Sequence, residues 1–327
     1  MHDRKGGRAK ADALSVRKRK RVSAVAEGRG AEIRRQILPR IAQSRNIFRT
    51  ERDGRTALRG ELVETKHMIE MRVGEQNEFE RQTERIKLAL DEVRAYGADI
   101  GVTCAYGQIL NQAALDLFPY GIINVHGSLL PAYRGSSPIQ WSIIKGETVT
   151  GVTVMQTALG VDSGDIILQR ELAIGAEETA GELFDRMAQF APDVLLTALA
   201  MIQNGTATRT PQEHEKATHY PMLDKTSGVI DWTKSATEIV NLVRGVHPWP
   251  GATATVCGEV LKVHKATLAD GAGEAGTVLK SDGKSGLVIA AGQGAVRLDT
   301  VQRAGKRAVK DVEYLCGNAV AVGTKLC

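Results

Sequence analysis

Three side chains with complementary chemistry occur in two short stretches of the sequence. Asn124 and His126 lie two residues apart in NVHGSLLPAYRG, and Asp162 lies in the Gly-rich stretch ALGVDSGD. An Asn amide can donate a hydrogen bond to a developing oxyanion, and an Asp can orient an imidazole that transfers a proton. Taken singly, His126 is more typical of a structural histidine and Asp162 of a turn residue. Together they predict a site for acyl transfer.

Neither stretch supplies a protein nucleophile in a recognisable setting. No Ser or Cys lies in the sharp strand-to-helix turn that exposes an attacking oxygen or sulfur. The attacking group is therefore expected to come from the substrate, as it does when an acyl group is transferred to an amine. Histidine suits such a reaction because its ordinary pKa lies nearest to neutral pH.

The residues around the site predict strands that end beside one another. GIINVH (121–126) and the apolar run 100–105 are typical of strands buried on both faces of a parallel sheet. Side chains at i and i+2 point the same way in a strand, so Asn124 and His126 share one face. Ligands of open parallel sheets bind beyond the carboxyl ends of the strands. A helix from Pro138 and a capped helix over 179–205 complete a mainly parallel α/β domain over 76–205.

A second domain is expected after a linker. Residues 206–227 are polar and carry two prolines, which is typical of a linker. A helix follows Ser235, and short apolar segments separated by glycines then fill the rest of 228–327. Short strands with frequent Gly turns predict a small OB-like β-barrel.

The net charge is concentrated in one segment. Residues 1–50 carry 15 Lys and Arg against 4 acids, whereas the whole chain has a net charge of +5. The remaining residues are net acidic, so the charge does not identify the whole chain as a nucleic-acid binder. The four cysteines form no C-x-x-C pair, which disfavours disulfides and structural zinc and favours a reducing cytoplasm. No apolar run is long enough to span a membrane.

Longer motifs around the site resemble a known family. INVHGSLLPAYRGSSPIQW and GVTVMQTALGVDSGDIILQ are similar to the formyltransferases that use 10-formyltetrahydrofolate. ATHYPMLDKTSGVIDW, LVRGVHPWPGA and LDTVQRAGKRAV resemble the members that act on methionyl-tRNA. The resemblance covers residues 95–315. It implies a Rossmann-like, mainly parallel sheet followed by an OB-like barrel, and formyl transfer to the methionine α-amine of initiator methionyl-tRNA.

The resemblance also implies roles for individual residues. Asn124 would stabilise the oxyanion, and His126, oriented by Asp162, would assist proton transfer away from the amine. The residues implied to contact the co-substrate 10-formyltetrahydrofolate are Ser128, Leu129, Leu130, Pro131, Ala105, Tyr106 and Gly107. The cations implied to bind tRNA are Arg134, Lys262, Lys265, Arg303, Lys306 and Arg307, although composition alone would make them an ordinary solvated surface. No metal is implied, and the chain is expected to be a cytoplasmic monomer without membrane attachment.

The N-terminal residues depart from the family pattern. The apolar first strand and the Gly-Thr-Pro turn are not found, and DRKGGRAK (3–10) resembles the basic loop that normally follows the second strand. We therefore expect residues 1–75 to be an atypical basic segment that is disordered or non-native, as an altered reading frame or a diverged gene copy would produce. A parallel sheet without its first strands would lose pairing partners and apolar burial.

Two alternative functions remain open on the sequence. The first is a formyltransferase for an amino sugar nucleotide, because such enzymes share the NVHGSLLP motif and the Asp loop. The second, from a different class, is a catalytically silent RNA-binding protein that uses the basic segment and the barrel. Transfer assays with each acceptor distinguish the first alternative, and tRNA binding without turnover would indicate the second.

Overall fold

The computed structural model describes residues 49–50, 56–57 and 76–326, and the chain forms two units, Met1–Val63 and Glu64–Cys327. In the first unit, β1 (Arg49–Thr50) pairs antiparallel with β2 (Thr56–Ala57). The predictions of disorder and of a changed reading frame concern residues 1–75, most of which lie outside the described residues, and they stay predictions.

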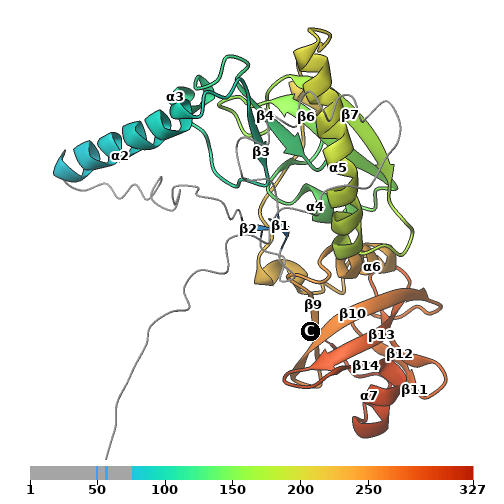
Figure 1. Ribbon diagram of the computed structural model, residues 1–327. Coiled ribbons are helices and arrows are strands. Elements are labelled where there is room, and N and C mark those ends of the chain that lie inside the picture. The colour runs from blue at the N-terminus through green and yellow to red at the C-terminus, as the bar shows by residue number, and fades with distance from the viewer. Residues whose placement is uncertain (1–48, 51–55, 58–75, 327) are drawn as a thin grey trace, which may run out of the picture. The chain divides into compact units, whose positions relative to one another are not determined.

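A four-stranded sheet in the second unit carries the predicted catalytic strand. Its order is β3-β4-β6-β7, and Figure 1 shows it with helix α5 alongside. The elements are α2 (Gln76–Ala95), β3 (Gly101–Cys104), α3 (Gln112–Leu115), β4 (Ile122–His126), β5 (Arg134–Gly135), α4 (Pro138–Ile144), β6 (Val149–Gln156), β7 (Ile166–Ala173) and α5 (Ala180–Gln203).

The class of this domain is confirmed, but the strand directions differ from the expected pattern. The β3–β4 pair is parallel, whereas the β4–β6 and β6–β7 pairs are antiparallel. Helix α4 has seven residues and rises only about 10 Å, which is less than the roughly 16 Å spanned by a five-residue strand. After this helix the chain enters β6 beside the end of β4, where His126 lies opposite Thr153, and β6 runs in the opposite direction.

Local capping signals place the helices as the sequence predicts. Thr179 and Glu182 form the expected capping box at the start of α5, and Pro138 occupies the first turn of α4 after the N-cap Ser137. Buried Ile143 from α4 and Leu183 from α5 lie in one apolar cluster. Among the described residues, no helix is both long and apolar enough to cross a membrane.

The segment predicted as a linker makes specific contacts with the catalytic domain. It contains η2 (His214–Lys216), β8 (His219–Tyr220) and η3 (Lys225–Gly228). Strand β8 pairs in parallel with β5, and the indole Nε1 of Trp141 donates to the carbonyl oxygen of Pro221. The segment is thus packed against the residues that follow the catalytic strand.

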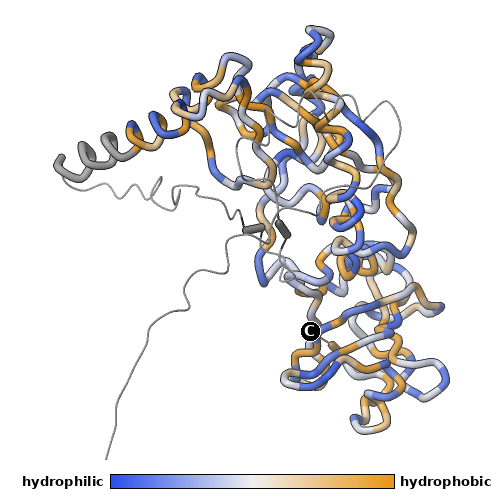
Figure 2. Tube along the Cα trace, in the orientation of Figure 1, coloured by the Kyte–Doolittle hydropathy of each residue, from blue (hydrophilic) through white to orange (hydrophobic). Residues whose placement is uncertain are grey.

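The C-terminal part is the expected antiparallel β domain. Its six strands have the order β11-β12-β13-β10-β9, and β14 pairs with β13. Burial alternates along β9, as it should in a strand with one face toward a core, and Figure 2 shows apolar and polar segments interspersed along this domain. The elements are α6 (Ala236–Gly245), β9 (Ala252–Val256), β10 (Glu259–Ala269), β11 (Val278–Asp282), β12 (Gly286–Ala290), β13 (Ala295–Arg303), β14 (Ala308–Lys310) and α7 (Asp311–Gly317).

One buried carboxylate, that of Asp311 at the start of α7, connects this helix to β12 and β13. Asp311 is 1% exposed, and the Arg297 guanidinium donates to both of its oxygens at 2.7 and 3.0 Å. The backbone N–H of Leu287 also donates to it at 3.1 Å. Burial alone would raise the pKa of this carboxyl, but the Arg297 and backbone hydrogen bonds outweigh burial and lower it. Asp311 is therefore an anion held by a counterion.

Candidate active site

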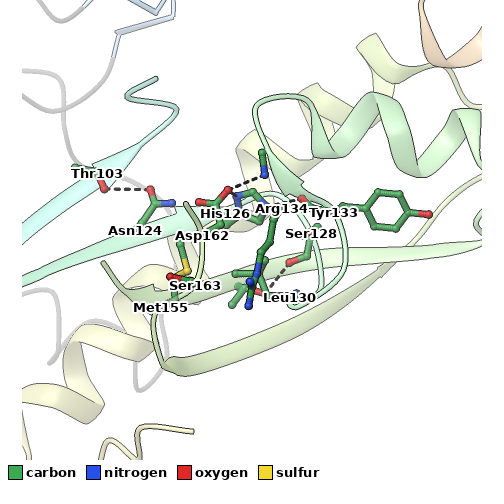
Figure 3. A network of polar contacts seen from close by, with 12 residues as sticks. Thr103, Asn124, His126, Ser128, Leu130, Tyr133, Arg134, Met155, Asp162 and Ser163 are labelled. Atoms are coloured by element: carbon green, nitrogen blue, oxygen red, sulfur yellow. Dashed lines mark hydrogen bonds and ion pairs between the residues drawn. The ribbon is translucent and has the colours of Figure 1, made fainter. Parts of the chain in front are cut away.

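The carboxyl end of β4 places Asn124 beside its two neighbouring strands. Asn124 lies opposite Thr103 on β3 and Met155 on β6. The Thr103 hydroxyl donates to Asn124 Oδ1 at 3.0 Å. Because the oxygen of the amide is thereby occupied, its nitrogen faces the other way, toward His126 and Asp162 (Figure 3). The Asn124 amide is thus oriented as a hydrogen-bond donor to the site.

His126 is buried and is oriented from both sides of its ring. Its exposed fraction is 6%, and its Nε2 lies 2.9 Å from the carbonyl oxygen of Tyr133. A carbonyl oxygen only accepts, so Nε2 carries the hydrogen. Nδ1 therefore faces Asp162, whose Oδ2 is 3.6 Å away. This separation is longer than a direct hydrogen bond.

The loop after β6 brings Asp162 to the same place. Its carboxylate Oδ2 accepts a hydrogen bond of 2.8 Å from the backbone N–H of Gly135. Asp162 has a φ of +48°, and Tyr133 has a φ of +61°. Non-glycine residues rarely adopt this left-handed region, and such strain concentrates at functional sites. The structure therefore unites the three predicted catalytic side chains and surrounds them with strained backbone.

Arg134 is a correction to the predicted tRNA-binding set. Its side chain is 5% exposed, so it cannot meet a tRNA phosphate. Its Nε and Nη2 both donate to Gln212 Oε1, at 3.1 and 2.6 Å, and Nη2 donates to His214 Nδ1 at 3.1 Å. Arg is almost never fully buried unless its donors find acceptors. Here the acceptors lie about 80 residues away in the chain, so the local sequence around Arg134 did not indicate that it is buried.

Sequence reasoning also missed Thr103 and Gln212. Thr103 occupies the register position opposite Asn124, which the alignment of two predicted parallel strands could have indicated. Gln212 lies in the polar segment after α5, yet it is only 5% exposed. Nothing in its local sequence, which resembles a linker, indicates that it is buried.

The hydroxyl and thiol groups near the site are not poised to attack a substrate. Ser128 Oγ donates to the carbonyl oxygen of Ala132 at 2.7 Å, and Ser163 Oγ donates to that of Gly160 at 3.0 Å. Burial raises the pKa of the Cys104 thiol at the end of β3, so it stays protonated near neutral pH. The arrangement fits a reaction whose nucleophile belongs to the substrate.

Tyr133 links the site to the surface through its side chain. Its hydroxyl donates to Glu147 Oε1 at 2.6 Å, and its ring stacks on Tyr220 with centroids 5.2 Å apart. Burial, together with the Glu147 carboxylate, raises the pKa of this phenol. Tyr133 is therefore a neutral anchor for the backbone carbonyl that holds His126.

The residues predicted to contact folate form two turns at the strand ends. In the first turn, Ser128 and Leu130 are buried, and the carbonyl oxygen of Leu130 accepts from Gln169 Nε2 at 2.9 Å. Pro131 follows Leu130, and Leu129 lies between the two buried residues. The second turn has left-handed backbone at both ends; its residues are Ala105, Tyr106 and Gly107. Their contact with folate stays a prediction.

A cavity of about 560 Å³ lies between the start of β4 and the loop after β6. Two buried polar atoms from this region, Gln156 Oε1 and Thr157 Oγ1, have no hydrogen-bond partner among the described residues. A volume of this size is typical of a small-molecule site. Apolar side chains that line it are Leu115, Phe118, Tyr120 and Leu159.

The remaining cations of the predicted tRNA-binding set lie on the β domain. Lys262 on β10 and Lys306 after β13 are exposed, and neither forms an ion pair within the described part of the chain. The other three each pair with a carboxylate: Lys265 with Glu177, Arg303 with Glu259, and Arg307 with Glu313. Lys262 and Lys306 are thus the cations most available to an anionic partner.

Known proteins resemble both parts of the chain. Residues 54–199 match the family model "Formyl transferase", and residues 222–319 match "Formyl transferase, C-terminal domain". Methionyl-tRNA formyltransferase of Acetivibrio thermocellus is 48% identical over 72% of this chain and 76% of that protein. Methionyl-tRNA formyltransferase of Alkaliphilus oremlandii is 42% identical over 76% of this chain and 80% of that protein.

Solved structures show the same fold at lower identity. HypX from Aquifex aeolicus, solved with tetrahydrofolic acid, has a TM-score of 0.53 and 20% identity. The match covers 72% of this chain and 43% of HypX. WlaRD, a sugar 3N-formyl transferase, has a TM-score of 0.51 and 20% identity over 64% of this chain and 73% of that chain. The family models and the two sequence relatives establish that the chain belongs to the methionyl-tRNA formyltransferase family.

Proposed function

We propose that this chain transfers the formyl group of 10-formyltetrahydrofolate to the α-amine of methionine esterified to initiator tRNA. The observation that carries the proposal is the convergence of Asn124, His126 and Asp162 at the end of β4, with no poised protein nucleophile beside them. The relatives at 48% and 42% identity support this acceptor over an amino sugar. We also propose that the chain acts in translation initiation, in the cytoplasm and as a monomer.

The oriented side chains suit each stage of this transfer. The amine nitrogen attacks the formyl carbon, the bond between that carbon and N10 breaks, and the proton lost by the amine ends on N10. The Asn124 amide, held by Thr103, donates to the formyl oxygen as negative charge develops there. His126 Nδ1 and the Asp162 carboxylate, 3.6 Å apart, move the proton. Tyr133 and Gly135 hold these two groups in place through their backbone.

The cavity beside the start of β4 supports a site for the aromatic part of the folate. The apolar side chains of Leu115, Phe118 and Tyr120 would contact its ring faces. This cavity is the proposed site for that part of the folate, and the predicted turn residues are not among those that line it. Replacing Gln156 with Leu should raise the KM for the folate more than the KM for the tRNA, and an unchanged folate KM would contradict this placement.

A transfer assay with three acceptors tests the proposed function. The full chain is incubated with 10-formyltetrahydrofolate and either initiator methionyl-tRNA, elongator methionyl-tRNA or a dTDP-linked amino sugar. We expect formylmethionyl-tRNA with the initiator and little product with the other two. Product from the amino sugar alone would support the sugar alternative. Tight tRNA binding without any product, measured by filter binding, would support the RNA-binding alternative.

A further inference from the structure

We infer that Gln212 is a positioning residue for the Asp162–His126 pair. Its side chain joins two stretches of the active site that are also linked by the hydrogen bond from the Gly135 N–H to the Asp162 carboxylate. Its Oε1 accepts from Arg134 Nε and Nη2, and its Nε2 donates to the carbonyl oxygens of Asp162, at 2.9 Å, and Gly164, at 2.7 Å. The inference rests on the proposed function, because its effect is on formyl transfer.

The orientation of the Gln212 amide is fixed by what its neighbours can do. A guanidinium only donates, so the amide oxygen must face Arg134. The two backbone carbonyls only accept, so the amide nitrogen must face the loop. These four contacts and a longer one from Nε2 to Met155 Sδ, at 3.8 Å, occur at a residue that is 5% exposed, where an unmade hydrogen bond is costly. An amide of this length is the side chain that satisfies both sides together.

The two stretches joined by Gln212 are those that orient the catalytic pair. On one side, Arg134 lies between Tyr133, whose carbonyl holds His126 Nε2, and Gly135, whose N–H holds the Asp162 carboxylate. On the other side, Gln212 binds the carbonyl of Asp162, a residue kept in left-handed backbone. Losing the amide would free this backbone to relax. The Asp162 carboxylate would then move relative to His126 Nδ1.

Two variants of Gln212 and one control test the contacts of its amide oxygen and its amide nitrogen. Gln212→Met removes both sets of hydrogen bonds at similar volume, and Gln212→Glu keeps an acceptor for Arg134 but places an oxygen against the loop carbonyls. Glu215→Met is the matched control, because its exposed side chain lies in the same segment. We expect both Gln212 variants to lower kcat by about 10- to 100-fold with both KM values within about twofold, because misplacement by about 1 Å costs this much. The control should keep wild-type kcat.

A double-mutant cycle distinguishes positioning from a general loss of structure. If Gln212 acts through Asp162, Gln212→Met should lower kcat by less than about threefold in an Asp162→Asn background, since residues acting as a unit are strongly non-additive. Multiplicative losses in the cycle, or a Gln212→Glu variant with more than half of wild-type kcat, would overturn the inference. If Gln212→Met gives no cooperative thermal unfolding, it is not folded, and the kcat of the Gln212→Glu variant then tests the inference instead.

A readout that needs no turnover keeps this inference separate from the proposed function. The imidazole NMR signals of His126, assigned with a His126→Gln variant, should shift in Gln212→Glu and stay unchanged in Glu215→Met. If the wild-type chain formylates none of the three acceptors, the proposed function fails while this signal still reports on positioning. If the signal is unchanged in Gln212→Glu, the inference fails whatever the wild-type activity is.

Discussion

The β domain buries the charged side chain of Asp311, and the active site buries that of Arg134. The two side chains differ in the kind of partner that they bind. Asp311 in the β domain has the Arg297 guanidinium as its counterion. Arg134 at the active site is bonded to two neutral or titratable acceptors, Gln212 and His214. A buried ion with its counterion is tied to the integrity of the fold, because removing one partner is strongly destabilising. A buried ion with amide and imidazole partners instead orients those partners. The two regions should therefore fail in different ways.

Loss of the imidazole proposed to be catalytic should produce the largest effect, and this effect should be on activity more than on stability. His126→Ala is expected to lower kcat by about 10³-fold, because a positioned proton-transfer group contributes in that range. The free energy of unfolding should fall by about 1–2 kcal/mol, since the Tyr133 carbonyl loses its donor. Formyl transfer and urea unfolding measure the two effects. A kcat within tenfold of wild type would remove His126 from the mechanism.

Loss of the buried carboxylate in the β domain should reverse this pattern. Asp311→Ala is expected to lower the free energy of unfolding by about 3–5 kcal/mol, because it leaves the Arg297 cation without its counterion. The kcat of the molecules that remain folded should be unchanged. Glu274→Ala is the control, because Glu274 forms an exposed ion pair with Lys325, and such pairs contribute about 0–1 kcal/mol. Equal losses in the two variants would contradict the role given to Asp311.

The lowered pKa of Asp311 allows a prediction of how the free energy of unfolding changes with pH. The folded-state pKa of Asp311 is depressed below its ordinary value of 3.8. Its stabilising contribution is therefore present above that value and is lost as the pH falls through the folded pKa. The difference in unfolding free energy between the wild type and Asp311→Asn should shrink as the pH falls below about 4. A constant difference between pH 7 and pH 2 would contradict this account.

The smallest expected effect concerns the orientation of the oxyanion donor. Thr103→Val removes the hydroxyl that holds Asn124 Oδ1 and keeps the shape of the side chain. We expect kcat to fall about fivefold, which corresponds to one hydrogen bond of about 1 kcal/mol. Thr103→Ser retains the hydroxyl and should restore most of the rate. A Val variant with wild-type kcat would show that Asn124 is oriented without Thr103.

Local signals made part of this molecule predictable from its sequence. The Thr179–Glu182 capping box and the pairing of Asn124 with His126 on one strand depend on neighbours a few residues away. The antiparallel β domain follows from short apolar segments between glycines. The direction of β6 was not predictable from apolar runs, because parallel and antiparallel buried strands have similar compositions.

The positions that sequence reasoning misplaced depend on distant partners. Arg134 is a residue type that is usually exposed, and Gln212 lies in a segment that resembles a linker. Both are buried, and they are hydrogen-bonded to each other. The convergence of Asp162 on His126 depends on a loop whose path no local pattern specifies, and it was expected from the complementary chemistry of the side chains and from the family resemblance. Charge and polarity alone therefore assign such residues to the surface.

The pairing of Gln212 with Arg134 also has a consequence for how the enzyme is made. The two residues are 78 positions apart in the chain, so a ribosome must synthesise well beyond the last helix of the catalytic domain before this contact can form. Residues 134 and 219, paired in β5 and β8, impose the same delay. The nascent chain thus contains Asn124, His126 and Asp162 well before Gln212 and its contacts with Arg134 and Asp162. A protein engineered to end at residue 205 would carry Asn124, His126 and Asp162 and would lack Gln212, the residue that we infer positions the last two.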